Sequence, residues 1–182
     1  MTIYDYSVKD MYGNDFSLEA FRGKVVLIVN TATGCGFTPH YEPIEKMYED
    51  YHDKGFEVLD IPCNQFMHQA PGDEQAITDF CTLHYNTKFP QMKKSDVNGE
   101  NELPLYAWLK SQKGFSGWEG KGAKMLKLAS AANGKSRKPD DIKWNFTKFV
   151  IGRDGSVVAR FEPFHDMAEV EKCVAGLVEQ AD

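Results

Sequence analysis

The run KVVLIVN at residues 24–30 constrains the fold more than any other feature of this chain. It is mostly β-branched and lacks polar alternation, which is typical of a central strand buried on both faces. A second strand is indicated by FEVLDI at residues 56–61. Apolar residues between the two runs recur at helical spacing, so we expect a helix over about residues 39–54. Together these segments predict a β-α-β unit.

Both ends of the expected helix carry their own signals. Thr38 followed by Pro39 indicates an N-cap and a first helical residue, because proline lacks the N–H that the first turn leaves unpaired. Gly55 is expected to end the helix. The loop TATGCGF at residues 31–37 therefore places Cys35, flanked by two glycines, just before a helix N-terminus.

The remaining elements are expected in the order helix, helix, hairpin, helix. Asp73 is expected to cap a second helix, and Pro104 to begin a third over about residues 103–109. The turn RDGS at residues 153–156 separates two apolar runs and indicates a hairpin. Apolar residues at helical spacing predict an amphipathic C-terminal helix, namely Met167, Val170, Val174 and Leu177. We predict an α/β protein with a thioredoxin-like fold: a central mixed β-sheet flanked by helices, with an N-terminal β-hairpin extension ending near Phe21.

The length and composition of the chain restrict its class. Its 182 residues, 42% of them hydrophobic, predict a single domain over residues 1–182 with a substantial core. No apolar run approaches the roughly 20 residues of a membrane span, and the N-terminus lacks the pattern of a signal peptide. We therefore expect a cytoplasmic protein. A net charge of −6 argues against binding to nucleic acid.

One stretch differs from the rest in charge. Residues 113–143 contain eight Lys and Arg against three Asp and Glu, and are rich in Gly, Ala and Ser. We interpret them as a basic insertion between the third helix and the hairpin. The insertion is either a solvated, partly helical surface loop or a cationic patch that attracts anionic partners.

The four cysteines are Cys35, Cys63, Cys81 and Cys173. They are too few and too scattered for a disulfide scaffold, and without CxxC spacing or a nearby histidine they indicate no metal site and no cofactor. Unpaired N–H groups and the helix dipole favour a thiolate at Cys35, which suggests a nucleophile. By position alone Cys81 and Cys173 are core residues on apolar helix faces, whereas Cys63 at a strand end fits either interpretation.

Three motifs in this chain resemble those of the glutathione peroxidase family. They are NTATGCGFTP at residues 30–39, PCNQFMHQAPG at residues 62–72 and WNFTKF at residues 144–149. Their order and spacing match over nearly the whole chain. Two positions depart from the family pattern: Gly34 stands where a longer polar residue is common, and Ala70 where Glu is common.

The resemblance implies a role for each matching residue. Cys35 occupies the place of the peroxidatic selenocysteine or cysteine, and Gln69, Trp144 and Asn145 match the other members of the catalytic tetrad. A thiolate that attacks hydrogen peroxide or an organic hydroperoxide becomes a sulfenic acid. The amides and the indole are neutral donors that stabilise the thiolate and the leaving oxygen.

Cys81, within DFCTLHY, matches the resolving cysteine of the family's thioredoxin-dependent branch, which overrides the interpretation from its position alone. The resemblance implies an intramolecular disulfide between Cys35 and Cys81 that thioredoxin reduces. We expect the two cysteines to lie too far apart for a bond in the reduced fold. The second helix would then have to unwind locally before the disulfide forms.

Two alternatives share the same residues. Glutathione is one, as a direct reductant, with Cys35 replacing a selenocysteine; the other is a peroxide sensor that passes oxidation to a client protein. A general disulfide oxidoreductase would need a CxxC motif at this loop, which the chain lacks. A peroxiredoxin would instead activate its cysteine with a Thr and a distant Arg in a Pro-rich motif. The implied partners are a hydroperoxide and either thioredoxin or glutathione, with no nucleic acid and no membrane span. The oligomeric state is left open, with a monomer favoured.

Overall fold

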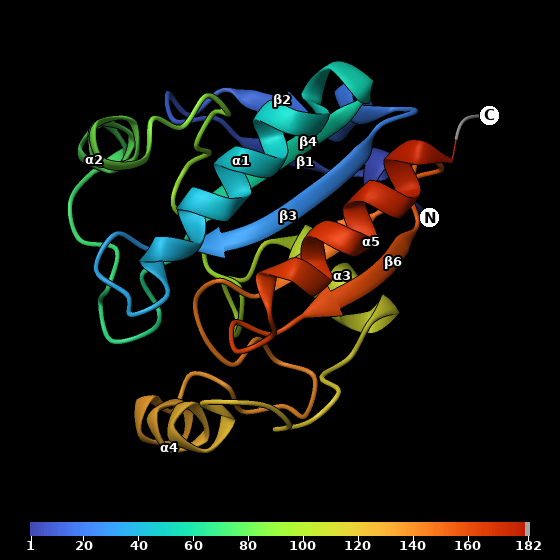
Figure 1. Ribbon diagram of the computed structural model, residues 1–182. Coiled ribbons are helices and arrows are strands. Elements are labelled where there is room, and N and C mark those ends of the chain that lie inside the picture. Colours follow the sequence, from blue (N-terminus) through green and yellow to red (C-terminus); the bar gives the residue numbers. More distant parts are fainter. Residues whose placement is uncertain (181–182) are drawn as a thin grey trace.

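A four-stranded mixed sheet forms the centre of the computed structural model, which describes residues 1–180 (Figure 1). The strand order is β4-β3-β5-β6. Strands β3 (Val25–Thr31) and β4 (Phe56–Pro62) are parallel, while β5 (Lys148–Ile151) runs antiparallel to β3 and to β6 (Val157–Phe161). Every residue of β3 is buried, which confirms the central strand predicted from its β-branched run.

Helices cover both faces of this sheet. Helix α1 (Tyr41–Tyr51) and helix α5 (Met167–Glu179) lie side by side on one face, and α3 (Pro104–Gln112) lies behind the sheet (Figure 1). Helix α2 (Glu74–Tyr85) packs beside α1. The Asp73 side chain accepts a hydrogen bond from the Ala76 N–H, so the predicted cap of α2 is present.

A small hairpin precedes the sheet, as predicted. Its strands are β1 (Ser7–Lys9) and β2 (Asp15–Ser17), which pair antiparallel. Short 3₁₀ turns occupy the remaining regular segments of the first third of the chain, at Ile3–Asp5, Leu18–Phe21, Thr38–His40 and His52–Lys54. The helix expected over residues 39–54 is therefore α1 with a 3₁₀ turn at each end, and Gly55 ends it with φ of 87°.

Thr38 does not cap this helix, which corrects the expectation from the sequence. Its hydroxyl accepts a hydrogen bond from the Cys35 N–H at 2.9 Å and donates one to the Ala32 carbonyl at 2.8 Å. The Thr38 side chain is turned back toward the loop because two buried backbone groups there need a partner. Thr38 therefore fixes the backbone of Cys35 instead of the start of α1.

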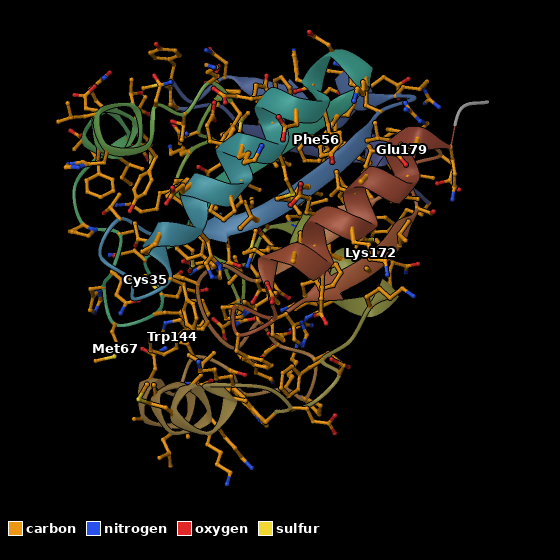
Figure 2. All side chains as sticks on the ribbon, in the orientation of Figure 1. Cys35, Phe56, Met67, Trp144, Lys172 and Glu179 are labelled. Carbon is orange, nitrogen blue, oxygen red and sulfur yellow. The ribbon has the colours of Figure 1, made fainter. Side chains whose placement is uncertain are left out.

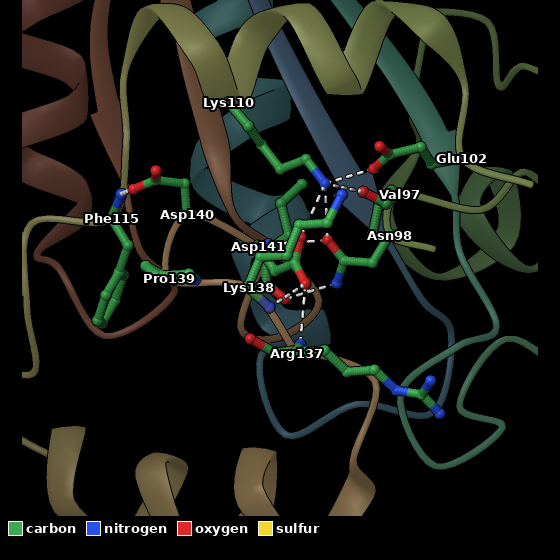
Figure 3. Close-up of polar contacts among 12 residues, drawn as sticks. Val97, Asn98, Glu102, Lys110, Phe115, Arg137, Lys138, Pro139, Asp140 and Asp141 are labelled. Carbon is green, nitrogen blue, oxygen red and sulfur yellow. Dashed lines mark hydrogen bonds and ion pairs between the residues drawn. The ribbon is translucent and has the colours of Figure 1, made fainter. Parts of the chain in front are cut away.

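The basic insertion forms helix α4 (Ala123–Asn133), which lies apart from the two layers around the sheet (Figure 1). The segment after α4 is joined to the main body through a buried polar cluster around Lys110 (Figure 3). The ammonium group of Lys110 contacts the carboxylates of Glu102 and Asp141 and the side-chain oxygen of Asn98. Asp141 also accepts hydrogen bonds from the backbone N–H groups of Arg137 and Lys138, at 2.8 Å each. Among residues 1–180, no helix is long and apolar enough to cross a membrane.

The core around β3 should dominate stability. Leu27 is fully buried and pairs with Val58 on one side and Val150 on the other. We expect Leu27→Ala to lower the free energy of unfolding by about 3 kcal/mol, because it removes buried methyl groups and leaves a cavity. Urea unfolding followed by circular dichroism would measure the loss. Val158→Ala on β6, where the side chain is 37% exposed, is the control and should cost less than about 1 kcal/mol. Equal losses in the two variants would contradict this account of the core.

Candidate active site

The thiol of Cys35 lies in the loop that follows β3, close to the start of the 3₁₀ turn Thr38–His40. The residue is only 7% exposed. Its Sγ accepts a hydrogen bond from the Phe37 N–H at 3.4 Å, and the Trp144 indole is the side chain that lowers the pKa of this thiol as a donor would. Groups from two distant parts of the chain therefore act on one sulfur atom.

Trp144 and Asn145 lie in the site because their segment is bonded to the end of β3. The Asn30 side chain donates to the Trp144 carbonyl at 3.2 Å, and the Asn30 carbonyl accepts from the Phe146 N–H at 2.6 Å. Phe146 is fully buried in the left-handed region, with φ of 67°. A bulky residue seldom adopts this conformation, so the backbone turns here only because the surrounding packing holds it.

Gln69 comes from a loop that also contains residues in the left-handed backbone region. Met67 and His68, immediately before it, have φ of 52° and 54°. The Gln69 carbonyl accepts from the Gly34 N–H at 2.8 Å, and its side-chain oxygen accepts from Asn145 Nδ2 at 3.3 Å. A Cβ on Gly34 would lie 3.3 Å from the Gln69 carbonyl oxygen, so the glycine permits this close approach.

The structure thus brings together all four residues matched to the tetrad. Figure 2 shows Cys35 and Trp144 at one end of the molecule, with Met67 nearby and α4 below. The loop of Gln69 also contacts α4: Asn133 at the end of that helix accepts from the Met67 N–H at 3.0 Å and donates to the Gln65 carbonyl at 3.2 Å. The basic insertion therefore borders the candidate site.

Burial dominates the electrostatics of Cys35 and raises its pKa, which corrects the expectation of a thiolate favoured by its position alone. A thiolate is poorly solvated at a site so little exposed to water. The Phe37 N–H, the Trp144 indole and the charge of Lys148 act in the opposite direction and lower the pKa. The reactivity of this thiol thus depends on the groups around it.

Two residues of this site were missed in the sequence. Lys148 on β5 is fully buried, and its ammonium group donates to His40 Nδ1 at 3.0 Å and to the Phe146 carbonyl at 2.8 Å. Burial lowers the pKa of Lys148 to about 7, and burial together with Lys148 lowers that of His40 to about 3. A lysine within the apolar run before the RDGS turn is the signal that could have identified it.

Cys81 is fully buried on α2, within hydrogen-bonding range of the Tyr41 hydroxyl. Burial, reinforced by the charge of Asp60, raises the pKa of Cys81 to about 12. The four cysteines are all free thiols in this structure, so Cys35 and Cys81 are not joined. Burial also raises the pKa of Cys63 to about 12, whereas Cys173 on α5 is half-buried.

Next to Cys81, Asp60 is a carboxylate buried among neutral groups. It accepts hydrogen bonds from the Thr31 hydroxyl at 2.5 Å and the Tyr41 hydroxyl at 2.9 Å. Burial raises its pKa to about 6, although these hydrogen bonds and one from Gln91 lower it in part. No cluster of three or more metal-binding side chains occurs among residues 1–180.

Comparisons with known structures place this fold in a class. A thiol:disulfide interchange protein of the thioredoxin family from Chlorobium tepidum superposes with a TM-score of 0.59 at 14% identity, covering 95% of this chain and 92% of that one. This likeness shows a thioredoxin-like fold. The structure of T. cruzi GPX1 is nearer, with a TM-score of 0.70 and 32% identity over 98% of this chain and 97% of that one.

Sequence comparison identifies the family within this class. The glutathione peroxidase family model matches residues 3–110. A glutathione peroxidase homolog of Neisseria meningitidis is 48% identical over 98% of this chain and the whole of its own length. The glutathione peroxidase-like peroxiredoxin 2 of Saccharomyces cerevisiae is 42% identical over 97% of each chain. The chain belongs to the glutathione peroxidase family, whose members are oxidoreductases that act on peroxides with a thiol reductant.

The buried Asp60 should make stability depend on pH. Its folded pKa of about 6 lies above the ordinary value of 3.8, so its ionisation opposes folding, and stability is lost as the pH rises through this interval. At about 1.4 kcal/mol per unit, the loss amounts to roughly 3 kcal/mol. We expect the unfolding free energy of Asp60→Asn to rise by about this amount relative to the parent between pH 3.5 and pH 7.

Urea unfolding at several pH values would measure this difference. Asp53→Asn, at an exposed carboxylate after α1, is the control and should show no such trend. If the difference in unfolding free energy between Asp60→Asn and the parent is the same at every pH, burial does not disfavour the ionised form of Asp60.

Proposed function

We propose that this protein is a thiol peroxidase in which Cys35 reduces hydrogen peroxide and organic hydroperoxides. The observation that carries the proposal is the hydrogen bond from the Phe37 N–H to the Cys35 sulfur, together with the Trp144 indole that lowers the pKa of the same thiol. Gln69 and Asn145, bonded to each other at 3.3 Å, are joined to this site by the Gly34–Gln69 backbone hydrogen bond and by the chain next to Trp144. We assign Cys35, Gln69, Trp144 and Asn145 as the catalytic residues.

The reaction follows from this arrangement. The Cys35 thiolate attacks one peroxide oxygen, the O–O bond breaks, and the second oxygen leaves as hydroxide or alkoxide and takes up a proton. Cys35 is oxidised to a sulfenic acid and the hydroperoxide is reduced to water or an alcohol. Donors that already point at the sulfur stabilise charge on both sides of the breaking bond without reorganising. A buried site also shields the sulfenic acid from solvent.

Cys81 is proposed to resolve the sulfenic acid. Its thiol displaces the sulfenic hydroxyl as water, which forms the Cys35–Cys81 disulfide. Because Cys81 is fully buried with a pKa of about 12, it is unreactive where it lies. Opening of α2 would expose the thiol to water and lower its pKa. Opening would also release Asp60 from the environment that opposes its ionisation.

Thioredoxin is the proposed reductant of this disulfide, in the cytoplasm. The yeast relative is named a glutathione peroxidase-like peroxiredoxin, whereas a Lactococcus lactis relative at 43% identity is named simply glutathione peroxidase. Direct reduction by glutathione, with Cys35 in the place of selenocysteine, would leave Cys81 without a catalytic role. A peroxide sensor would use both cysteines but pass the disulfide to a client protein. The reductant assay below separates the three.

Two single substitutions test the two-cysteine cycle. We expect peroxide-dependent NADPH oxidation, measured with thioredoxin and its reductase, to vanish in Cys35→Ser and in Cys81→Ser. The first variant lacks the nucleophile, and the second stops after one turnover at the sulfenic acid. Cys173→Ser, which alters a half-buried thiol on α5, is the control and should keep full activity.

The same assay with glutathione and its reductase in place of thioredoxin tests the alternative reductant. Glutathione-driven turnover that survives in Cys81→Ser would exclude Cys81 as the resolving residue. Disulfide formation without turnover on either reductant would favour the sensor.

The Trp144 indole is expected to act mainly on the reacting charge. We expect Trp144→Phe to slow oxidation of Cys35 by hydrogen peroxide about 100-fold, because one donor to the developing charge is lost. The same loss should raise the pKa of Cys35. Stopped-flow kinetics would give the rate. Trp118→Phe in the insertion, where the ring packs on Phe164, should react at the parental rate. An unaltered rate in Trp144→Phe would remove the indole from the mechanism.

A further inference from the structure

The positive charge of the basic insertion is concentrated in one short stretch. Residues 120–138 contain six Lys and Arg and no Asp or Glu, because the three acidic residues of the insertion lie at positions 119, 140 and 141. The whole chain carries −6 and this stretch +6, so the remainder carries −12. None of the ion pairs within residues 1–180 includes a basic residue of this stretch. These charges attract an anionic partner and repel a cationic one.

Two of the lysines lie where they oppose the formation of α4. Lys121 directly precedes the N-cap residue of the helix, and Lys124 lies in the first turn, which contains no acidic residue. The N-terminus is the positive end of the helix dipole, so cations there are unfavourable and carboxylates are preferred. The stability of α4 therefore does not account for these lysines, and binding of an anion does.

The outward side of α4 is apolar as well as basic. Met125 and Leu128 are 76% and 74% exposed, and they alternate with the exposed Lys124 and Lys127. The buried residues of α4 lie on the opposite side of the helix, namely Ala123, Leu126 and Ser130. An exposed apolar strip lined by lysines is typical of helices that lie in the interface of a membrane. Lysine suits this position because its stem packs on apolar groups while its ammonium group stays in the polar layer.

The loop of Gln69 extends this strip toward the candidate active site. Met67 is 63% exposed, and its N–H donates to the side chain of Asn133 at the end of α4 at 3.0 Å. Asn133 also donates to the Gln65 carbonyl at 3.2 Å. Figure 2 shows Met67 and Cys35 at the end of the molecule where α4 lies. Two hydrogen bonds thus hold the basic helix beside the loop of the candidate site.

A cavity beside α4 has a similar character. Its volume is about 420 Å³, and its lining includes the rings of Phe115 and Trp118 together with Lys127 and Lys143. None of the residues among 1–180 that line it is acidic. A tryptophan ring, with one polar N–H on an apolar body, suits the boundary between lipid headgroups and acyl chains. The cavity therefore suits an anionic headgroup.

We propose that this face of the protein binds the surface of an anionic lipid bilayer. The lipid-binding surface consists of Lys121, Lys124, Met125, Lys127, Leu128 and Met67. Its ammonium groups contact headgroup phosphates, and its apolar side chains enter the layer beneath them. An acidic protein is a poorer occupant, because protein interfaces are enriched in aromatic residues and Arg and depleted in Lys, and α4 contains neither aromatic residues nor Arg. Binding of lipid requires no catalysis, so the inference goes beyond the proposed function.

Sedimentation with lipid vesicles tests the charge of this surface. We expect the parent to sediment with vesicles of equal parts phosphatidylcholine and phosphatidylglycerol, and not with phosphatidylcholine alone. High salt should release it by screening the lysines. The double variant Lys124→Gln/Lys127→Gln should bind about 30-fold more weakly, at about fivefold for each lysine. Lys54→Gln/Lys172→Gln removes the same charge at exposed positions elsewhere and should bind like the parent.

A second pair of variants tests the apolar contribution. Leu128→Gln should weaken binding to the anionic vesicles about tenfold, because its apolar side chain no longer enters the bilayer. Leu83→Gln, at a residue of α2 that is 81% exposed, is the matched control and should bind like the parent. Both residues are exposed, so neither change should unfold the protein. Equal affinities in these two variants, or in the two double lysine variants, would overturn the proposal.

Hydrogen exchange locates the surface without any substitution. Anionic vesicles should slow amide exchange in residues 123–133 and in the loop around Met67 of the parent, and leave α5 unaltered. Protection confined to other segments would overturn the proposal. So would a parent that does not sediment with anionic vesicles, and an acidic protein would then be the alternative occupant. Cys35→Ser should bind vesicles like the parent, so failure of the proposed peroxidase function is distinguishable from failure of this inference.

Discussion

The hydrogen bonds of Asn30 join the two halves of the candidate site. Asn30 is fully buried near the end of β3, and it bonds the carbonyl of Trp144 and the N–H of Phe146. This pairing brings a segment from beyond residue 140 to within reach of Cys35, which lies five residues after Asn30. Two buried backbone groups of that segment, the Trp144 carbonyl and the Phe146 N–H, are thereby paired. The positions of the Trp144 indole and of Lys148 therefore depend on the hydrogen bonds of Asn30.

The charged and polar groups around Cys35 differ from those around Cys81. Both thiols are buried and both have raised pKa values, but Cys35 faces N–H donors and a cation, whereas Cys81 faces the carboxylate of Asp60. The groups beside Cys35 oppose the effect of burial and lower its pKa in part, whereas Asp60 adds to the effect of burial on Cys81. In the proposed cycle this difference lets Cys35 react first and keeps Cys81 inactive until α2 moves. The order of the two steps thus follows from the local electrostatics.

The sequence predicted most of the fold because its signals are local. The buried strand β3, the Asp73 cap and the RDGS hairpin each depend on neighbours along the chain. Thr38 was assigned wrongly because its residue type suits a helix cap, yet its hydroxyl binds the Cys35 backbone. Which partner a hydroxyl takes depends on the path of the loop, and local pattern does not fix that path.

For the site, the sequence by itself determined the candidate residues and the family, because three long motifs occur in order and with the right spacing. Only the tertiary structure decided the charge around them. Lys148, His40 and Asp60 are ordinary in the sequence, and burial shifts the pKa of each. Burial arises from contacts between segments more than a hundred residues apart, such as that between His40 and Lys148. A pattern within one segment therefore cannot reveal that the site contains a buried cation.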